Sequence, residues 1–188
     1  VYLILFSIIF IETGLVIANF LPGDTTLFTA GMMAALGELN LSVLLISLSA
    51  ATILGNTSNF FIGNFLGKKF LKKERARRNR YLKKSFVYFE NNSAKAITVS
   101  RFIPFFRSFV PFVAGISSMN LKTFTIYNIL GGILWVTTYI LVGFFFGAIP
   151  WVKSNYGLIF SGIILLFILG LVIGILKPVI YYLLKKQS

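Results

Sequence analysis

Two long runs without a charged residue constrain this chain more than any other feature of its sequence. They extend from Phe124 to Ile149 and from Gly157 to Leu176. A helix of roughly 20 apolar residues crosses the hydrocarbon core of a bilayer. A third uncharged run, Ser42–Leu66, contains three asparagines. We interpret 42–66, 124–149 and 157–176 as transmembrane helices.

The composition extends this interpretation to the whole chain of 188 residues. Hydrophobic residues make up 57% of it and charged residues only 12%, about half of the charged share of an ordinary soluble domain. A soluble domain of this size has too little interior to bury so much apolar surface. The sequence therefore predicts an all-α integral membrane protein that forms one membrane domain, 1–188.

The basic residues predict the orientation. Ten of the 18 lie within 68–84, where Glu74 is the one acidic residue. Cytoplasmic loops are enriched in Lys and Arg, and basic loops are attracted to anionic lipid. We therefore expect 68–84 to be a cytoplasmic loop and not a nucleic-acid site. The alternating spans then place the C-terminus in the cytoplasm as well.

Two further apolar segments, 1–36 and 86–119, contain helix-breaking residues. These are Pro22, Gly23, Pro104, Pro111 and Gly115. Non-helical backbone at membrane depth occurs only where protein or a water-filled cavity surrounds it. The orientation also returns each segment to the side from which it came. We therefore predict two re-entrant helical hairpins.

Each hairpin precedes a transmembrane helix, and the two halves have opposite orientations. This is the inverted repeat of secondary transporters, here with an additional C-terminal transmembrane helix. Glu12 precedes Pro22 by ten residues, and Arg101 precedes Pro111 by the same interval. Ten-residue spacings also arise by chance, so the shared pattern of break and topology is the stronger argument for the repeat. An Ala-Gly pair follows each of the two prolines, at 30–31 and 114–115.

Four charged residues lie within the broken segments: Glu12, Asp24, Arg101 and Arg107. Each costs about 2.5–3.5 kcal/mol at the centre of a membrane helix, so such residues face one another or a cavity. A break at Pro104 allows both arginines to point at one phosphate, whose oxygens fit the planar guanidinium group. The two carboxyl groups offer a route to proton coupling and gating. A buried ion-pair network that only holds the hairpins together remains an alternative.

The asparagines Asn19, Asn56 and Asn128 are secondary site candidates, and with Asn59 we expect them to form interhelical hydrogen bonds. Trp135 is expected to pack. The chain contains no histidine and no cysteine, which excludes a histidine nucleophile, base or metal ligand. We expect no metal and no cofactor. Because Val1 already lies in an apolar stretch, we expect the natural chain to begin earlier.

These residues resemble the DedA family, part of the VTT (SNARE-associated Golgi) superfamily. The resemblance runs from about Tyr2 to Phe146. The matching stretches are Phe10–Gly14, Phe20–Thr25, Ala30-Gly31, Arg101–Arg107, Pro111–Gly115, Asn128, and Gly131 through Trp135. Many members have Gly-Asp where this chain has Gly55-Asn56, which argues against a required acid at that position.

The resemblance implies a bacterial plasma-membrane transporter. Family members are linked to the return of undecaprenyl phosphate across the membrane, to proton-dependent envelope homeostasis and, in eukaryotic relatives, to lipid scrambling. The family's important charged positions coincide with the four named above. The leading hypothesis is therefore a flippase for a polyprenyl phosphate or another phospholipid, and not an enzyme. A homo-oligomer is compatible with this hypothesis.

Three alternatives remain open. A lipid diphosphate phosphatase would share the arginines, but histidine and a serine-rich loop are missing near them. A proton-coupled antiporter for a small ion or drug would use the same acids. A non-transporting assembly factor would tolerate the loss of both arginines.

Overall fold

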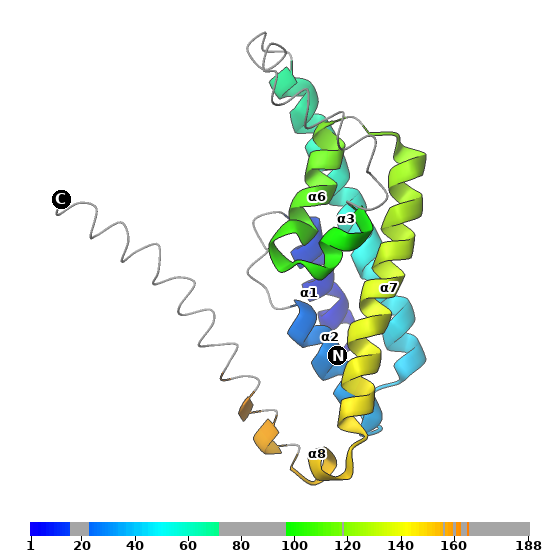
Figure 1. Ribbon diagram of the computed structural model, residues 1–188, viewed down its shortest axis with the longest axis vertical. Helices are drawn as coiled ribbons and strands as arrows, with labels where there is room; N and C mark the ends of the chain where they lie inside the picture. Colours follow the sequence, from blue (N-terminus) through cyan, green and yellow to red (C-terminus); the bar gives the residue numbers. More distant parts are fainter. Residues whose placement is uncertain are drawn as a thin grey trace, which may run out of the picture.

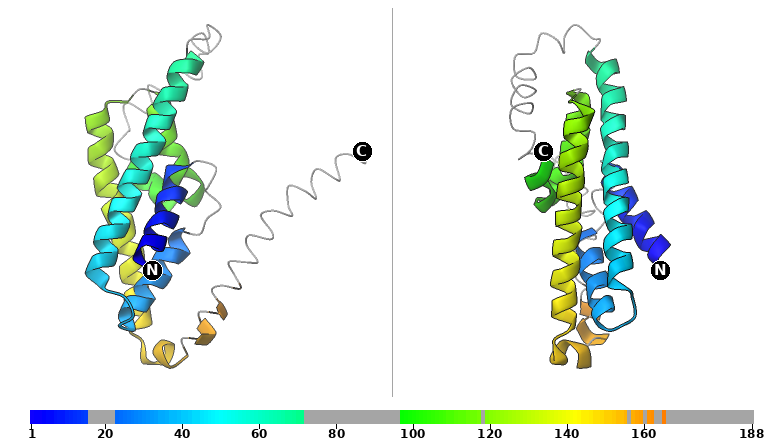
Figure 2. Two further views of the ribbon diagram at one scale, coloured as in Figure 1. Left: turned by 180° about the vertical axis from the view of Figure 1, so that it is seen from behind. Right: turned by 90° about the vertical axis from the view of Figure 1, so that its right-hand side faces the viewer.

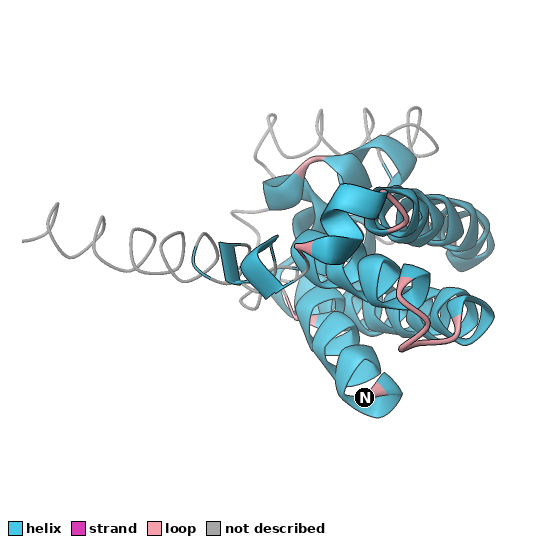
Figure 3. Cartoon of the chain, turned by 90° about the horizontal axis from the view of Figure 1, so that it is seen from below, coloured by secondary structure: helices cyan, strands magenta, loops and turns pink. Residues whose placement is uncertain are grey.

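The computed structural model describes residues 1–15, 23–71, 97–117, 119–155, 157–159, 161–162 and 165. These residues form helices and turns, with no strand among them (Figure 3), so the predicted helical class is confirmed for this part of the chain. Most of the predicted loop 68–84 and helix 157–176 lies outside the described residues. So do Asn19, Pro22 and the start of 86–119.

Two long helices form the frame. They are α3 (Leu41–Leu71) and α7 (Leu121–Gly147), which pack side by side and run in opposite directions (Figure 1). Each contains 27 residues that are apolar and long enough to cross a membrane, Leu41–Gly67 in the first and the whole of the second. They contain the predicted segment 42–66 and most of 124–149.

The N-terminal half adds two short helices, α1 (Tyr2–Gly14) and α2 (Gly23–Ala35). The first packs against α3, and the second lies along the lower part of α7 (Figure 1). After α2 the chain turns at Gly37, whose φ of 84° favours glycine. The amide of Glu38 donates to the carbonyl of Met33, which closes the helix end.

The C-terminal half contains the 3₁₀-helix η2 (Ser100–Phe102), α6 (Pro104–Ile116) and, after α7, the short α8 (Pro150–Ser154). The chain breaks at Ile103, which is extended, and Pro104 begins the new helix, where its missing N–H costs nothing. Pro111 and Gly115 were also expected to break the segment, but α6 continues through both. Membrane helices tolerate proline because neighbouring helices support the backbone.

The two halves repeat one pattern of close helix contact. A Cβ on Gly31 would overlap the carbonyl oxygen of Ile140, and one on Gly143 would overlap that of Phe28, so α2 touches α7 backbone to backbone. In the same way α6 touches α3. There the glycines are Gly115 and Gly63, and the carbonyls are those of Phe60 and Phe112. Small residues are the usual means of such approach between membrane helices.

The spacing of these contacts relates the halves. The glycines of α7 follow those of α3 by 80 residues, and Gly115 follows Gly31 by 84. Asn40 and Asn120, also 80 apart, both cap a long helix, since each Oδ1 accepts an amide N–H of the first turn. With an offset of 84, Pro22 corresponds to Phe106 and not to Pro111, so the two ten-residue spacings are not part of this repeat, whereas the Ala-Gly pairs at 30–31 and 114–115 are.

The repeat brings two helix N-termini together. From the middle of the molecule α2 runs toward one end along α7, and α6 runs toward the other end along α3 (Figures 1 and 2). Their first turns meet at half height, where Asp24 and Arg107 form an ion pair. Apolar clusters fill the space on either side, one around Trp135 and Leu48, the other around Phe60 and Phe124.

Candidate functional site

Three charged side chains from three short helices meet where α2 and α6 begin. Arg107 forms ion pairs with Glu12 and, at 2.8 Å, with Asp24. The side chains of Arg107 and Glu12 are 3% and 0% exposed, whereas that of Asp24 is 30% exposed. The cluster is therefore closed on the side of Glu12 and reachable on the side of Asp24.

Trp135 of α7 contacts two members of this cluster. Its indole N–H donates to the Asp24 carboxylate over 3.1 Å, and its ring lies 4.5 Å from the guanidinium carbon of Arg107. A cation over an aromatic face is attracted to it, more strongly when both are desolvated. The expectation that Trp135 only packs is therefore incomplete. A buried indole N–H usually has a hydrogen-bond acceptor. A tryptophan within an apolar helix is therefore a feature of the sequence that could have indicated a polar partner nearby.

Backbone geometry fixes the position of Glu12. The amide of Gly23 donates to its Oε1 over 3.0 Å, and a Cβ on Gly23 would overlap the carboxylate. A larger residue at position 23 would therefore require the Glu12 carboxylate to shift away from Arg107. The hydroxyl of Ser108 donates to the main-chain carbonyl of Glu12 over 3.2 Å, which ties α1 to α6.

Arg101 lies apart from the three-residue cluster. Its guanidinium group donates to the main-chain and side-chain oxygens of Asn128 and lies against Gly131 and Gly132. Arg107 lies against Trp135, about one turn further along α7. The structure therefore gives the two arginines different partners, where the sequence suggested that both point at one site.

Asn128 and Asn59 each form hydrogen bonds to other helices. Asn128 also donates to the carbonyl of Ile53 and the hydroxyl of Thr57, at 3.0 Å each. Asn59 donates to the carbonyls of Thr13 and Ser108. Both therefore form the interhelical bonds that the sequence predicted. For Asn56 the prediction was wrong, because neither polar atom of its buried side chain has a hydrogen-bond partner among the described residues. Asn19 lies outside the described residues.

Several buried side-chain polar atoms have no hydrogen-bond partner among the described residues. They are Glu12 Oε2, Thr52 Oγ1, both side-chain polar atoms of Asn56, Oδ1 of Asn59 and of Asn64, Nε and Nη1 of Arg101, and Nε of Arg107. Such atoms are costly to bury unpaired. Arg101 in particular is 2% exposed and carries unpaired donors, which makes it an unsatisfied cation.

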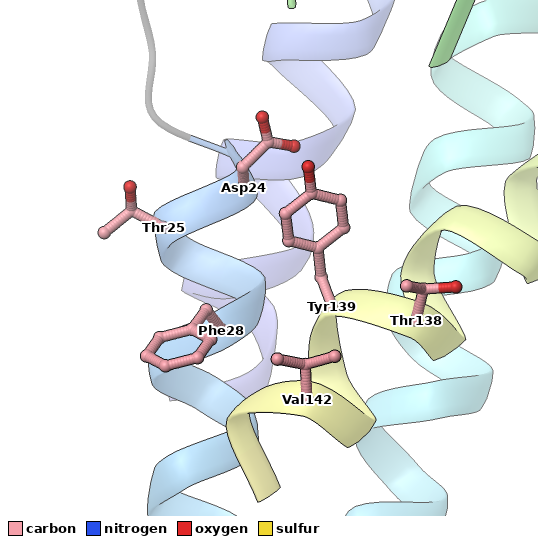
Figure 4. Close-up of a pocket in the computed structure, with 6 residues that line it drawn as sticks. All are labelled: Asp24, Thr25, Phe28, Thr138, Tyr139 and Val142. Atoms are coloured by element: carbon pink, nitrogen blue, oxygen red, sulfur yellow. The ribbon is translucent and has the colours of Figure 1, made fainter. Parts of the chain in front are cut away.

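A cavity of about 320 Å³ opens beside the cluster, between α2 and α7 (Figure 4). Its lining residues are Asp24, Thr25, Phe28, Thr138, Tyr139 and Val142. The cavity reaches Asp24, the partly exposed member of the cluster. Among the residues that the structure describes, no three carboxylate, histidine or cysteine side chains are close enough to hold a metal ion.

The fold and the site define a helical membrane protein in which two half-length helices meet over a buried ion-pair cluster. A family model described as the VTT domain matches residues 21–145. The chain belongs to the DedA family of VTT-domain membrane proteins, as the sequence motifs predicted.

The relatives carry names that agree. Protein DedA of Escherichia coli K12 is 41% identical over 181 residues, which cover 94% of this chain and 83% of that protein. An uncharacterized membrane protein of Mycobacterium leprae is 36% identical, with 89% and 76% covered. Inner membrane protein YghB of Escherichia coli K12 is 32% identical, with 99% and 86% covered. No solved structure matches.

Proposed function

We propose that this protein is a lipid transporter that moves a polyprenyl phosphate from one leaflet to the other. The leading candidate for the substrate is undecaprenyl phosphate. The observation that carries the proposal is the pairing of buried Arg107 with two carboxylates at the meeting point of two half-length helices. Helix N-termini attract anions, and in secondary transporters such paired termini surround the substrate site.

The charge balance gives the mechanism. Glu12 and Asp24 occupy the two Nη atoms of Arg107, so a phosphate makes a two-point contact with this arginine by displacing a carboxylate. A proton on Glu12 or Asp24 removes the competing charge and releases the guanidinium group. Phosphate binding is thereby linked to proton uptake, and the acids act as gate and proton carrier. Arg101, with its unpaired donors, offers the phosphate a second cation about one turn away.

The membrane arrangement belongs to the same proposal. The helices α1 and α2, and likewise η2 and α6, form re-entrant hairpins whose tips meet near the bilayer midplane, while α3 and α7 span it. The loop 68–84 and the C-terminus face the cytoplasm of a bacterium, and the protein crosses the plasma membrane several times. It acts on the lipid without chemical change, alone or as a homo-oligomer.

Translocation in proteoliposomes tests the proposal. Labelled undecaprenyl phosphate is incorporated in both leaflets, and its exposure is followed with an impermeant phosphatase or quencher. We expect the wild type to exchange the lipid between leaflets, and Arg107→Gln and Arg101→Met to be at least tenfold slower. Ile126→Ala, an exposed position of α7, serves as the control. A wild type that moves no lipid, with or without a pH gradient, overturns the proposal.

The alternatives give different outcomes in the same vesicles. A phosphatase releases inorganic phosphate from a lipid diphosphate, and an antiporter dissipates a proton gradient when a cation or drug is added without lipid. The double variant Glu12→Gln/Asp24→Asn tests the coupling. It has no titratable carboxyl paired with Arg107, so we expect its translocation rate to be independent of an imposed pH gradient, whereas the wild-type rate responds.

A further inference from the structure

The cavity between α2 and α7 differs in chemistry from one end to the other. Its wall is formed by Phe28, Val142 and the methyl-bearing Thr138, while the oxygen atoms of Asp24 and Tyr139 lie close together at one end (Figure 4). Val142 is 55% exposed. The cavity therefore opens at the outer surface of the helices and ends at the charged cluster.

The equivalent position in the other half is closed. The offsets of 84 and 80 residues place Ser108 and Asn59 where Asp24 and Tyr139 stand. Asn59 donates to the main-chain carbonyl of Ser108 over 2.7 Å, and both residues are fully buried. The pseudosymmetric pair thus joins α3 to α6 at the level where the α2–α7 contact leaves a cavity. The two halves therefore differ at this position: the cavity is present between α2 and α7, while the corresponding place between α3 and α6 is closed by the hydrogen bond.

We propose that this cavity is the lateral portal of the transporter: it binds the first part of the hydrocarbon chain of a lipid phosphate and directs the phosphate to Arg107. The inference rests on the proposed function and adds the route and the chain-binding site. A volume of about 320 Å³ lies at the small end of the range for ligand pockets. It accommodates one chain segment, while the rest of the lipid stays in the bilayer.

The order of the residues explains why a phosphate is selected. Arg107 lies behind Asp24 and contacts it at 2.8 Å, so a head group at the inner end of the portal meets the carboxylate first. An anionic head group replaces Asp24 as partner of Arg107, which exchanges one anion for another. A neutral head group offers no anion that competes with Asp24 for Arg107, so the ion pair stays closed and the head group does not enter the cluster.

Site-specific crosslinking tests the portal. The chain contains no cysteine, so Val142→Cys carries a single benzophenone label. Leu130→Cys is the matched control, because Leu130 is 58% exposed and lies twelve residues away on the same helix, about 18 Å along its axis. Each variant is irradiated in liposomes with radiolabelled polyprenyl phosphate or, separately, the corresponding polyprenol. The ratio of the two adduct yields at one position cancels differences in exposure.

We expect this phosphate-to-alcohol ratio to be at least fivefold higher at position 142 than at 130, and unlabelled polyprenyl phosphate to abolish the excess. Equal ratios at the two positions overturn the portal. Translocation provides the second measurement. Val142→Trp fills the cavity and is expected to slow translocation at least tenfold, whereas Leu130→Trp retains the wild-type rate.

Lipid transport and the lateral portal can be refuted independently of each other. A wild type that moves lipid, combined with equal crosslinking ratios, retains the transporter and removes the portal. A wild type that moves no lipid removes the transporter, while selective crosslinking at position 142 then reports a binding site for lipid phosphates without transport. If Val142→Trp does not fold, as shown by size-exclusion chromatography, the crosslinking ratio alone decides.

Discussion

The indole ring of Trp135 lies 4.5 Å from the guanidinium carbon of Arg107, while its N–H donates to the carboxylate of Asp24 over 3.1 Å. One side chain of α7 therefore holds both members of an ion pair that joins α2 to α6. The position of α7 therefore affects how Arg107 and Asp24 are oriented toward each other.

Trp135→Phe is expected to keep the ring under Arg107 and to lose the hydrogen bond to Asp24. The loss of one hydrogen bond corresponds to about 0.5–1.5 kcal/mol of stability. Trp135→Leu also loses the cation–π contact and leaves a smaller side chain in the core, so it is expected to be less stable still. Thermal unfolding in detergent measures the order. Equal melting temperatures for the two variants would contradict it.

Arg107→Gln is expected to destabilise the protein by about 3–5 kcal/mol, because it leaves two carboxylates beside each other without their cation. Glu12→Gln in the same chain removes one of these charges. We therefore expect the double variant Glu12→Gln/Arg107→Gln to be more stable than Arg107→Gln alone. A double-mutant cycle on the unfolding free energies measures this coupling. Additive effects would show that Glu12 and Arg107 do not interact.

Arg101→Met is expected to behave in the opposite way. Arg101 contacts the neutral side chain of Asn128 and retains unpaired donors, so its removal eliminates a buried charge without creating another. The melting temperature should be unchanged or higher, while lipid translocation falls at least tenfold. Arg101→Lys keeps the charge and serves as the comparison. A large loss of stability in Arg101→Met would assign Arg101 a structural role.

The close helix contacts give a prediction that is independent of function. Gly31→Ala and Gly115→Ala place a Cβ on a carbonyl oxygen of the facing helix, and overpacking of this kind costs about 1–3 kcal/mol. Gly157→Ala is the control, since a Cβ there meets no atom within 4 Å. Because alanine is the better helix former, this control should be neutral or slightly stabilising. Melting temperatures of the three variants decide.

Much of the site was visible in the sequence because ionisable residues within apolar segments are conspicuous. Glu12, Asp24, Arg101 and Arg107 stand out for that reason, and three of them do form one cluster. Their pairing was not visible. Arg107 lies 83 residues from Asp24 and 95 from Glu12, and no local pattern specifies which arginine meets the acids.

The sequence by itself determined the helical class, the two long apolar helices and the family, because helix length, apolar composition and local motifs are properties of neighbouring residues. Only the tertiary structure decided that Arg101 and Arg107 have separate partners, that Trp135 belongs to the site and that α6 continues through Pro111. The close approach of α2 to α7 and of α6 to α3, backbone to backbone, is likewise visible only in the packed structure. That approach fixes which side chains share the space between the helices.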